Sequence, residues 1–524
     1  MNNSSRPTYT RQVARAASLV MALFVASRAM GLLREMVIAH QFGTSAELDA
    51  YLAAFRLPDL FFALMAGGAL GSALIPVYAS YLARGDESGG WHLASAIINW
   101  VLLVLSVAGL LAAMAAPALV AHIIAPGFSP AQQALTVELM RWMLASTIVF
   151  GASGVVMAIL NARQHFLLPA LAPIIYNAGI IAGAWFLGPT MGVRGAVVGV
   201  FVGAAGHLLL QLPGLRRQGM RYTVQLSPHD PGVREVGRLM APRALGQAAV
   251  ELNYLVNVIL ASRLSAGSLS ALNYGRLLML LPQGVIAQSV AIAAFPTFST
   301  LAARGQRDEL RHILVTILRS VLYFTLPAAL GLIWLREPLV STILERGAFN
   351  AQSTQATAWA LMFYALGLVG HAVVEIITRA FYALHDTRTP VVVGISAMLT
   401  NIALSLALVP VFEALDWLPF GGLALANSVA TTGEMIVLIF VIGKRLGGLE
   451  GRRLANALWR MGVACLVMLA VLTITAEALS ETSALLVSAA SIMAGAGSYG
   501  LVTLGLGSEE PMAAIQGARR RLGM

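Results

Sequence analysis

The stretch IPVYASYLARGD (residues 75–86) returns in the second half of the chain as FPTFSTLAARGQ (residues 295–306). Each copy closes a long apolar run. A second pair, NARQHFLLP (161–169) and YALHDTRTP (382–390), has nearly the same spacing and joins the same two kinds of run. The sequence therefore predicts two structural repeats of six spans each, which run parallel to one another rather than inverted.

The composition places these repeats in a membrane. Of the 524 residues 58% are hydrophobic and only 11% are charged, which leaves too little polar surface for a soluble protein of this size. Apolar runs of about 20 residues, the length of a helix that crosses a bilayer, recur along the whole chain. The short alternating segments of a membrane barrel are absent. We therefore expect an all-α polytopic protein with about 14 spans, at residues 14–41, 48–83, 92–125, 133–162, 166–187, 193–212, 236–262, 268–302, 311–335, 353–384, 390–410, 420–443, 455–476 and 484–507.

The basic residues predict the orientation of these spans. With a cytoplasmic N-terminus, about 21 Lys and Arg fall in inner segments and about four in outer ones. This bias requires an even number of spans and puts both termini in the cytoplasm. The net charge of +10 thus reflects topology and does not call for a nucleic-acid partner. The single cysteine, Cys465, excludes a disulfide framework within the chain, and the basic start followed by an apolar run predicts an uncleaved first helix.

The repeats suggest the domain organisation. We expect an N-lobe over residues 1–212, a basic cytoplasmic linker over 213–235, a C-lobe over 236–446, and two additional helices with a basic tail over 447–524. Two pseudo-symmetric lobes around a central cleft form an architecture that transporters use for alternating access.

The first span carries charge in its interior. Within VASRAMGLLREMV (25–37) lie Arg28, Arg34 and Glu35. An arginine inside a span costs a few kcal/mol, so it normally faces protein or water and has a partner. A guanidinium group presents a planar fork of donors that suits phosphate or carboxylate oxygens. The structural alternative is that Arg28 pairs with Glu35, which shares its helix face, while Arg34 reaches the outer interface.

Further charges occupy matching places in the repeats. Arg56, before Pro58, corresponds to Arg276, which precedes Pro282. A proline bends a helix and frees a backbone carbonyl, so both lobes are expected to bring an arginine and a kink to the cleft. Asp49 could pair with one of these arginines or act as a gate, or it could simply be a charge near a helix N-terminus. The cationic cleft indicates an anionic amphiphile as ligand.

Other polar residues within spans are weaker candidates. They could hold a coupling ion, although hydrogen bonding between helices is the commoner role. His371 and Glu375 share a helix face without a second pair, so no metal site is predicted. No Walker motif, nucleophile elbow or zincin helix is present, which argues against an ATPase acting alone and against the corresponding hydrolases. The remaining candidates are Gln247, Glu251, Asn253, Asn257, Asn401, Asn427 and Glu434.

Several motifs together resemble a known family. SRAMGLLREMVIAHQFGTSAELDAY, FRLPDL and IPVY in the first half, and NYGRLLMLLPQGV, FPTFSTLAARG and RAFYALHDTRTPV in the second, are similar to the MurJ (MviN) family of lipid II flippases. That family belongs to the multidrug/oligosaccharidyl-lipid/polysaccharide (MOP) exporter superfamily. The resemblance covers essentially the whole chain, including the two terminal helices.

The resemblance implies a function in peptidoglycan synthesis. The substrate would be lipid II, a polyprenyl pyrophosphate carrying a disaccharide-pentapeptide, or a related glycolipid, moved from the inner to the outer leaflet of the bacterial inner membrane. It implies contact of Arg28, Arg34, Asp49 and Arg276 with the pyrophosphate and head group. Glu35 and Arg56, singled out by their positions in the spans, are weaker candidates for the same site. No resident cofactor is expected. A coupling cation (Na⁺ or H⁺, unidentified), membrane lipids and the cell-wall synthesis machinery are expected partners.

The chain departs from the family in one place. Many members carry an arginine pair and later a glutamate after LPNL, whereas this chain has Phe62, Ala63 and Gly67 at those positions. The cleft is therefore expected to be less cationic. Alternative functions are transport of another lipid-linked oligosaccharide or a drug, and, more distantly, a membrane-embedded polyprenyl-sugar transferase or ligase. A drug exporter would favour acidic residues in the cleft. Membrane-embedded transferases and ligases usually have a large outer loop, whereas the outer loops of this chain are short.

Overall fold

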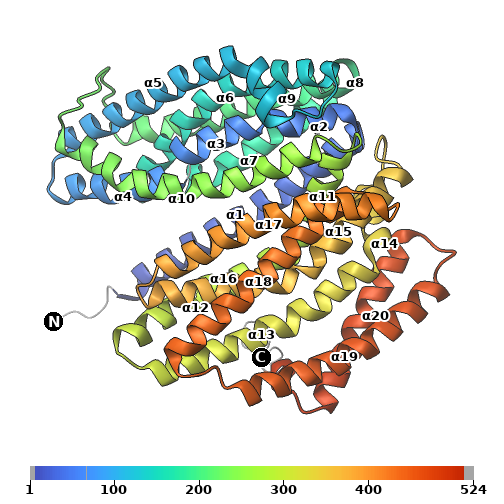
Figure 1. Ribbon diagram of the computed structural model, residues 1–524. Coiled ribbons are helices and arrows are strands. Elements are labelled where there is room, and N and C mark those ends of the chain that lie inside the picture. The colour runs from blue at the N-terminus through green and yellow to red at the C-terminus, as the bar shows by residue number, and fades with distance from the viewer. Residues whose placement is uncertain (1–5, 66–67, 513–524) are drawn as a thin grey trace. The chain divides into compact units, whose positions relative to one another are not determined.

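The computed structural model describes residues 6–65 and 68–512, and this part of the chain contains helices and turns but no strand (Figure 1). The predicted all-α fold class is confirmed. Gly67 lies outside the described residues. The helices, including three π-helical turns (η), are α1 (Arg6–Phe42), α2 (Ala46–Ala54), α3 (Arg56–Met65), α4 (Gly68–Ala83), α5 (Glu87–Leu119), η1 (Val120–Ile124), α6 (Pro130–Ala162), α7 (Leu167–Ala182), η2 (Gly183–Leu187), α8 (Gly188–Met191), α9 (Val193–Arg217), α10 (Pro231–Ala261), α11 (Ser268–Gln283), η3 (Gly284–Gln288), α12 (Ser289–Ala303), α13 (Arg307–Trp334), α14 (Arg336–Leu344), α15 (Ala351–Leu366), α16 (Leu368–Ala383), α17 (Arg388–Ala414), α18 (Phe420–Leu446), α19 (Gly451–Ala478) and α20 (Ala484–Gly505).

Each predicted span coincides with one or more of these helices. Within the described residues, 12 helical runs are long and apolar enough to cross a membrane, or 13 if α15 and α16, bent by 44° at Gly367, form one span. The helix α1 is not among them. A multi-pass helical protein is thus confirmed, while the count of 14 spans stays a prediction.

The internal repeat is visible in the backbone. Gly85 and Gly305, which hold the same place in the two copies of the first motif, both adopt a left-handed conformation, with φ of 73° and 69°. Gln164 and His385, which hold the same place in the second pair of motifs, do so with φ of 60° and 57°. Non-glycine residues rarely adopt positive φ. Positive φ values at matched positions of the two motifs therefore support two copies of the same backbone conformation.

The chain divides into two compact units. Unit 1 comprises Met1–Gly267 with Arg346–Phe349, and unit 2 comprises Ser268–Glu345 with Asn350–Met524. Helix α10 packs against α3 and α4 and so belongs to unit 1, although the predicted C-lobe begins at residue 236. The predicted lobe boundaries stay a prediction.

A seam of glycines joins α7 to α9 in unit 1. A Cβ atom on Gly179 would lie 2.5 Å from the Cα of Gly203, and one on Gly183 would lie 2.5 Å from the Cα of Gly199. These distances are shorter than the contacts that Cβ atoms make in proteins, so a side chain at either glycine would collide with the facing helix. The matching spacing of these glycines on both helices therefore lets backbone contact backbone, as small residues do between membrane helices.

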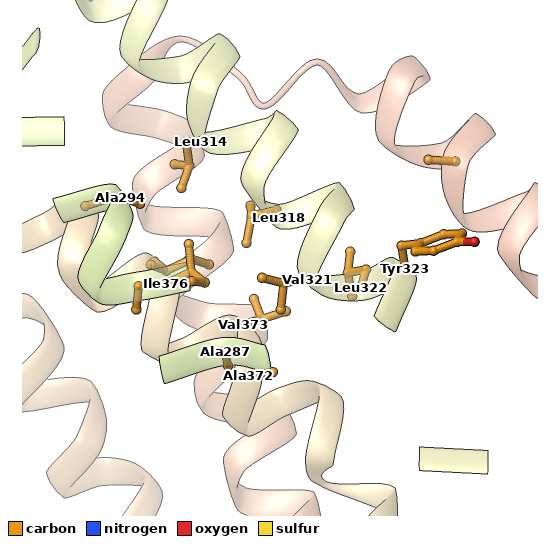
Figure 2. Packing of buried hydrophobic residues seen from close by; sticks show 14 of the residues in the cluster. Ala287, Ala294, Leu314, Leu318, Val321, Leu322, Tyr323, Ala372, Val373 and Ile376 are labelled. Carbon is orange, nitrogen blue, oxygen red and sulfur yellow. The ribbon is translucent and has the colours of Figure 1, made fainter. Parts of the chain in front are cut away.

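The core of unit 2 is built around α13. Figure 2 shows Leu314, Leu318 and Val321 of α13 facing Val373 and Ile376 of α16. All five side chains are almost completely buried. Leu314, Leu318 and Val321 follow one another at i+4 and i+3 and so form a single stripe, which is the pattern of a helix packed on one side against a partner.

The predicted linker 213–235 is shorter in the structure, because α9 continues to Arg217 and α10 begins at Pro231. Between them, Met220–Ser227 forms an extended segment, here called the strap, beside the first turns of α5 (Figure 1). Asn99 Nδ2 donates to the carbonyl oxygens of Thr223 (3.0 Å) and Gln225 (2.8 Å). Trp100 Nε1 donates to the Leu226 carbonyl oxygen at 2.7 Å. The strap is thus attached to α5 by side chains that bind its backbone.

The C-terminal helices are attached to α13 by ion pairs. Arg319, whose side chain is 7% exposed, contacts Glu510 at 2.6 Å and Glu509 at 3.1 Å. Arg453 on α19 also contacts Glu509, at 3.4 Å. The positive charge of Arg319 lowers the pKa of Glu509 below its ordinary value. These contacts secure the segment after α20 to unit 2.

Candidate functional site

Arg34 lies in a hydrogen-bonded group between α1 and α7. Its guanidinium contacts Glu35 Oε1 at 2.5 Å and donates to Asn177 Oδ1 at 3.1 Å. Asn177 in turn donates to the Pro173 carbonyl oxygen at 2.9 Å. The alternative pairing of Arg28 with Glu35 is therefore wrong. Adjacent residues pair instead, because the long Arg34 side chain can fold back along the helix to reach its neighbour. The charge of Arg34 is largely balanced inside unit 1.

Arg28 is placed differently on the same helix. Its side chain is exposed, and its guanidinium carbon lies 5.4 Å from the centre of the Phe24 ring. Within residues 6–65 and 68–512 no carboxylate forms an ion pair with Arg28. A cation–π contact at an exposed site contributes only about 0.5–1 kcal/mol. The Arg28 guanidinium is thus accessible to an anionic ligand.

Arg56 marks a break in the second predicted span. Helix α2 ends at Ala54 and α3 begins at Arg56. The helix is thus interrupted close to Pro58, where a kink was predicted. The guanidinium donates to the Leu52 carbonyl oxygen at 3.2 Å and lies 3.5 Å from the carboxylate of Asp59. Arg56 and Glu251 of α10 also line a small cavity of about 70 Å³. At this break, unit 1 thus pairs one guanidinium with the Asp59 carboxylate and places Glu251 on the wall of the same cavity.

Asp49 is buried and bound to the backbone. It is 2% exposed, and its carboxylate accepts a hydrogen bond of 2.7 Å from the backbone N–H of Gly267. Gly267 has a φ of +88°, and a Cβ there would lie 2.5 Å from the Thr44 carbonyl oxygen. Asp49 therefore secures a tight turn at the end of unit 1. Its predicted pairing with an arginine of the cleft stays a prediction.

Arg276 belongs to unit 2. It is half-buried on α11 and lies close enough to Tyr364 and His371 to interact with them electrostatically. The preceding residue, Gly275, allows α11 to approach α15, since a Cβ there would lie 2.9 Å from the Cβ of Ala360. The expected irregularity near Pro282 takes the form of the π-helical turn η3, which begins just after that proline. Close packing thus holds Arg276 beside polar groups of α15 and α16.

Several of the weaker candidates form hydrogen bonds or ion pairs with neighbouring side chains or backbone. His371 on α16 hydrogen-bonds Asn427 Oδ1 on α18 at 3.2 Å, and Glu375 pairs with Arg379 on its own helix at 3.0 Å. Asn257 donates to the Asn253 carbonyl oxygen. In the described part of the chain, no group of three His, Cys, Asp or Glu residues could hold a metal ion. The bonds of these five residues are of the structural kind, and a role for any of the weaker candidates in holding a coupling ion stays a prediction.

The structure adds residues that sequence reasoning missed. Asn177 and Asp59 bind the arginines of unit 1, and Asp59 could have been found from its i+3 spacing to Arg56. Phe62, one of the positions at which the sequence departs from the expected family pattern, contacts the Phe150 ring at 4.7 Å between centroids. Ala63 is buried. This part of α3 is therefore an apolar packing surface.

Comparisons with known proteins agree with this description. The family model described as Lipid II flippase MurJ matches residues 38–494. Lipid II flippase MurJ of Burkholderia cenocepacia is 30% identical over 442 residues, which cover 82% of this chain and 84% of that protein. A probable lipid II flippase MurJ of Vibrio cholerae is 30% identical over 444 residues, covering 82% and 83%.

Solved structures extend the comparison to the fold. A lipid II flippase MurJ in an inward closed conformation matches with a TM-score of 0.78 and 25% identity, covering 93% of this chain and 98% of that one. An inward-facing multidrug resistance MATE family transporter of the MOP superfamily matches with a TM-score of 0.69 and 15% identity, covering 83% and 99%. The second match concerns the fold alone. The family match, the relatives and the helical architecture lead to one conclusion, that the chain belongs to the MurJ family of lipid II flippases.

Proposed function

We propose that this protein moves lipid II across the bacterial inner membrane, from the cytoplasmic to the outer leaflet, for peptidoglycan synthesis. Its membership of a flippase family is the observation that carries the proposal. Arginine side chains on long helices of both units, Arg28 on α1 and Arg276 on α11, support it, because a diphosphate needs cationic partners inside the membrane. The process is transport without a change in covalent structure.

The two arginines of α1 have different roles in this proposal. Arg28 contacts the diphosphate directly, since its guanidinium is exposed and has only a ring contact. Arg34 acts through its hydrogen bond to Asn177, which holds α1 on α7, while Glu35 of the same helix balances its charge. Asp49 positions the turn at Gly267 rather than binding the head group.

The proposed cycle is alternating access. Each state of the protein makes different contacts with the lipid, and that difference in binding free energy biases the equilibrium between states. A coupling cation, Na⁺ or H⁺, or the membrane potential determines the direction in which the lipid is transported. The electrical contribution is about 2.3 kcal/mol for each elementary charge moved through 100 mV.

The proposed orientation places both termini in the cytoplasm. The excess of arginine in the inner segments supports it, because positively charged loops are retained on that side. Membrane lipids surround the exposed apolar side chains of the spans. The cell-wall synthesis machinery that uses lipid II would receive it at the outer leaflet.

One observation favours a second substrate class. Phe62 and Ala63 form an apolar surface where the resemblance to the family led us to expect an arginine pair. A less cationic lobe suits another polyprenyl-linked oligosaccharide with a smaller anionic head group. Competition between lipid II and such a glycolipid in reconstituted vesicles distinguishes the two substrates.

Complementation tests the site. In cells depleted of their own flippase, Arg28→Ala and Arg276→Ala should each fail to restore growth while accumulating in the membrane at parental levels. Arg194→Ala is the matched control, because Arg194 pairs with Glu138 and both side chains are well exposed. Normal growth of the Arg28 and Arg276 variants would refute the assignment.

Reconstitution tests the class of function. Purified protein in liposomes should redistribute lipid II between leaflets and leave its covalent structure intact. Consumption of lipid II, detected by mass spectrometry, would instead identify a transferase or ligase.

A further inference from the structure

The strap lies at one end of a lipid-facing stripe. Asn99, which binds the strap, is followed on the same face of α5 by Leu103, Val107 and Leu110 at helical spacing. These three side chains are 41%, 51% and 64% exposed. In a membrane helix, such a stripe contacts acyl chains. The strap therefore lies where this stripe meets the basic, cytoplasmic interface.

The residues around the strap carry unbalanced positive charge. Arg216 and Arg217 end α9, Arg221 lies in the strap, and all three side chains are exposed. In the part of the chain that the structure describes, no carboxylate forms an ion pair with any of them. At the corresponding end of α18 in unit 2, Arg445 pairs with Asp386 at 2.5 Å. Unit 1 leaves the equivalent charges available for an external anion.

The strap also presents apolar and aromatic side chains. Val224 is 88% exposed and Tyr222 is 49% exposed, although the Tyr222 hydroxyl donates to Asn99 Oδ1 at 2.5 Å. Trp100 is fixed by its bond to the Leu226 carbonyl oxygen. Tyrosine and tryptophan are enriched at the level of lipid head groups, where one end of the side chain is apolar and the other polar. This combination fits a membrane interface better than bulk water.

We propose that the strap and the end of α9 form a binding site for an anionic phospholipid of the cytoplasmic leaflet. The guanidinium groups of Arg216, Arg217 and Arg221 bind the phosphate of the head group, and Val224 inserts beside the glycerol backbone. An acyl chain follows the stripe that begins at Leu103. The hydrogen bonds from α5 hold the strap in place, so the site is preorganised.

The test is native mass spectrometry of the delipidated full-length chain titrated with equal amounts of phosphatidylglycerol and phosphatidylcholine of identical acyl chains. The parent protein should retain phosphatidylglycerol preferentially. The variant R216Q/R217Q/R221Q should bind it about tenfold more weakly or worse, because each arginine near the surface contributes to attraction of an anionic lipid. Phosphatidylcholine binding should not change.

The matched control is R304Q/R307Q, which removes two exposed arginines from a turn of unit 2 where Asp308 and Glu309 follow directly. It should retain the preference of the parent. Asn99→Ala, which keeps every charge but removes part of the attachment of the strap to α5, should also weaken phosphatidylglycerol binding. If the triple variant does not fold, as judged by its thermal unfolding midpoint, Arg221→Gln alone serves in its place.

Three results would overturn the proposal. The first is unchanged phosphatidylglycerol binding by the strap variants, and the second is an equal loss of phosphatidylglycerol binding in R304Q/R307Q. The third is displacement of the bound lipid by an acidic peptide at a lower concentration than by phosphatidylglycerol, which would indicate a protein partner.

Discussion

The first turns of α5 in unit 1 and of α13 in unit 2 occupy the same place in the repeat but bind different segments. In the register that aligns Gly85 with Gly305, His92 corresponds to His312 and Asn99 corresponds to Arg319. On α5, His92 and Asn99 bind the strap that follows α9. On α13, His312 contacts Glu450, just after α18, and Arg319 binds the segment after α20.

The chemistry of the two attachments differs. Asn99 makes neutral hydrogen bonds to backbone carbonyls, whereas Arg319 pairs with two carboxylates. The α5 face then continues as an exposed stripe. The α13 face is covered by α19 and borders an apolar cavity of about 440 Å³ lined by residues such as Tyr323 and Leu472. The repeat thus provides one anchoring face in each half, and the anchored segment has diverged.

The largest effect is expected where the anchor is a buried charge. Arg319→Ala leaves the carboxylate of Glu510, which is 7% exposed, without its cation. Removing one partner of a buried pair costs about 3–5 kcal/mol. The thermal unfolding midpoint of the purified chain should fall, and proteases should cut more readily after α20.

Arg311→Ala is the control on the same helix. Arg311 pairs with Asp308, whose side chain is 89% exposed, so the change should cost less than about 1 kcal/mol. Equal effects of the two substitutions would show that burial does not distinguish these ion pairs.

A smaller effect is expected at the neutral anchor. Asn99→Ala removes two of the hydrogen bonds to strap carbonyls and the acceptor for Tyr222, while the bond from Trp100 remains and water can replace the lost bonds at this half-buried site. The expected cost is about 1 kcal/mol. Hydrogen exchange and tryptic cleavage after Arg221 should both become faster. Ser88→Ala, which removes a hydroxyl bonded only to the exposed Asp86, should leave both rates unchanged.

The smallest effect concerns pH. Burial raises the pKa of Glu450, but the hydrogen bonds and charges of Arg453 and His312 outweigh it, so the pKa lies below its ordinary value. A carboxylate with a lowered pKa stabilises the folded state fully at pH 7, and this contribution is lost as the pH falls below about 4.3 and through the folded-state pKa. The contribution is less than about 1 kcal/mol, because the side chain is 24% exposed.

Thermal unfolding at a series of pH values checks this expectation. Glu450→Gln should lose less stability than the parent over that acidic interval. Glu481→Gln, at an exposed position, should follow the parent. Identical pH dependence of all three proteins would contradict the role given to Glu450.

Much of the fold can be predicted from the sequence, because the patterns that determine the helices are local. Apolar runs, Gly-Pro punctuation and the repeated Arg-Gly turn near Gly85 predict the helices and their duplication. The site is only partly readable. The pairing of Arg56 with Asp59 follows from helical spacing, but the contact of Arg34 with Asn177 depends on how α1 packs on α7. The bond from Gly267 to Asp49 joins distant parts of the chain and has no local signature.

The glycine seam between α7 and α9 has a mechanical consequence. Backbone lies against backbone at Gly179 with Gly203 and at Gly183 with Gly199, so sliding one helix along the other would bring larger side chains into these close contacts. Arg34 fastens α1 to the same pair through Asn177. We therefore expect α1, α7 and α9 to move together as a rigid body during a transport cycle. Bending must then concentrate at interruptions elsewhere, such as the junction at Phe55 in unit 1 and the one at Gly367 in unit 2.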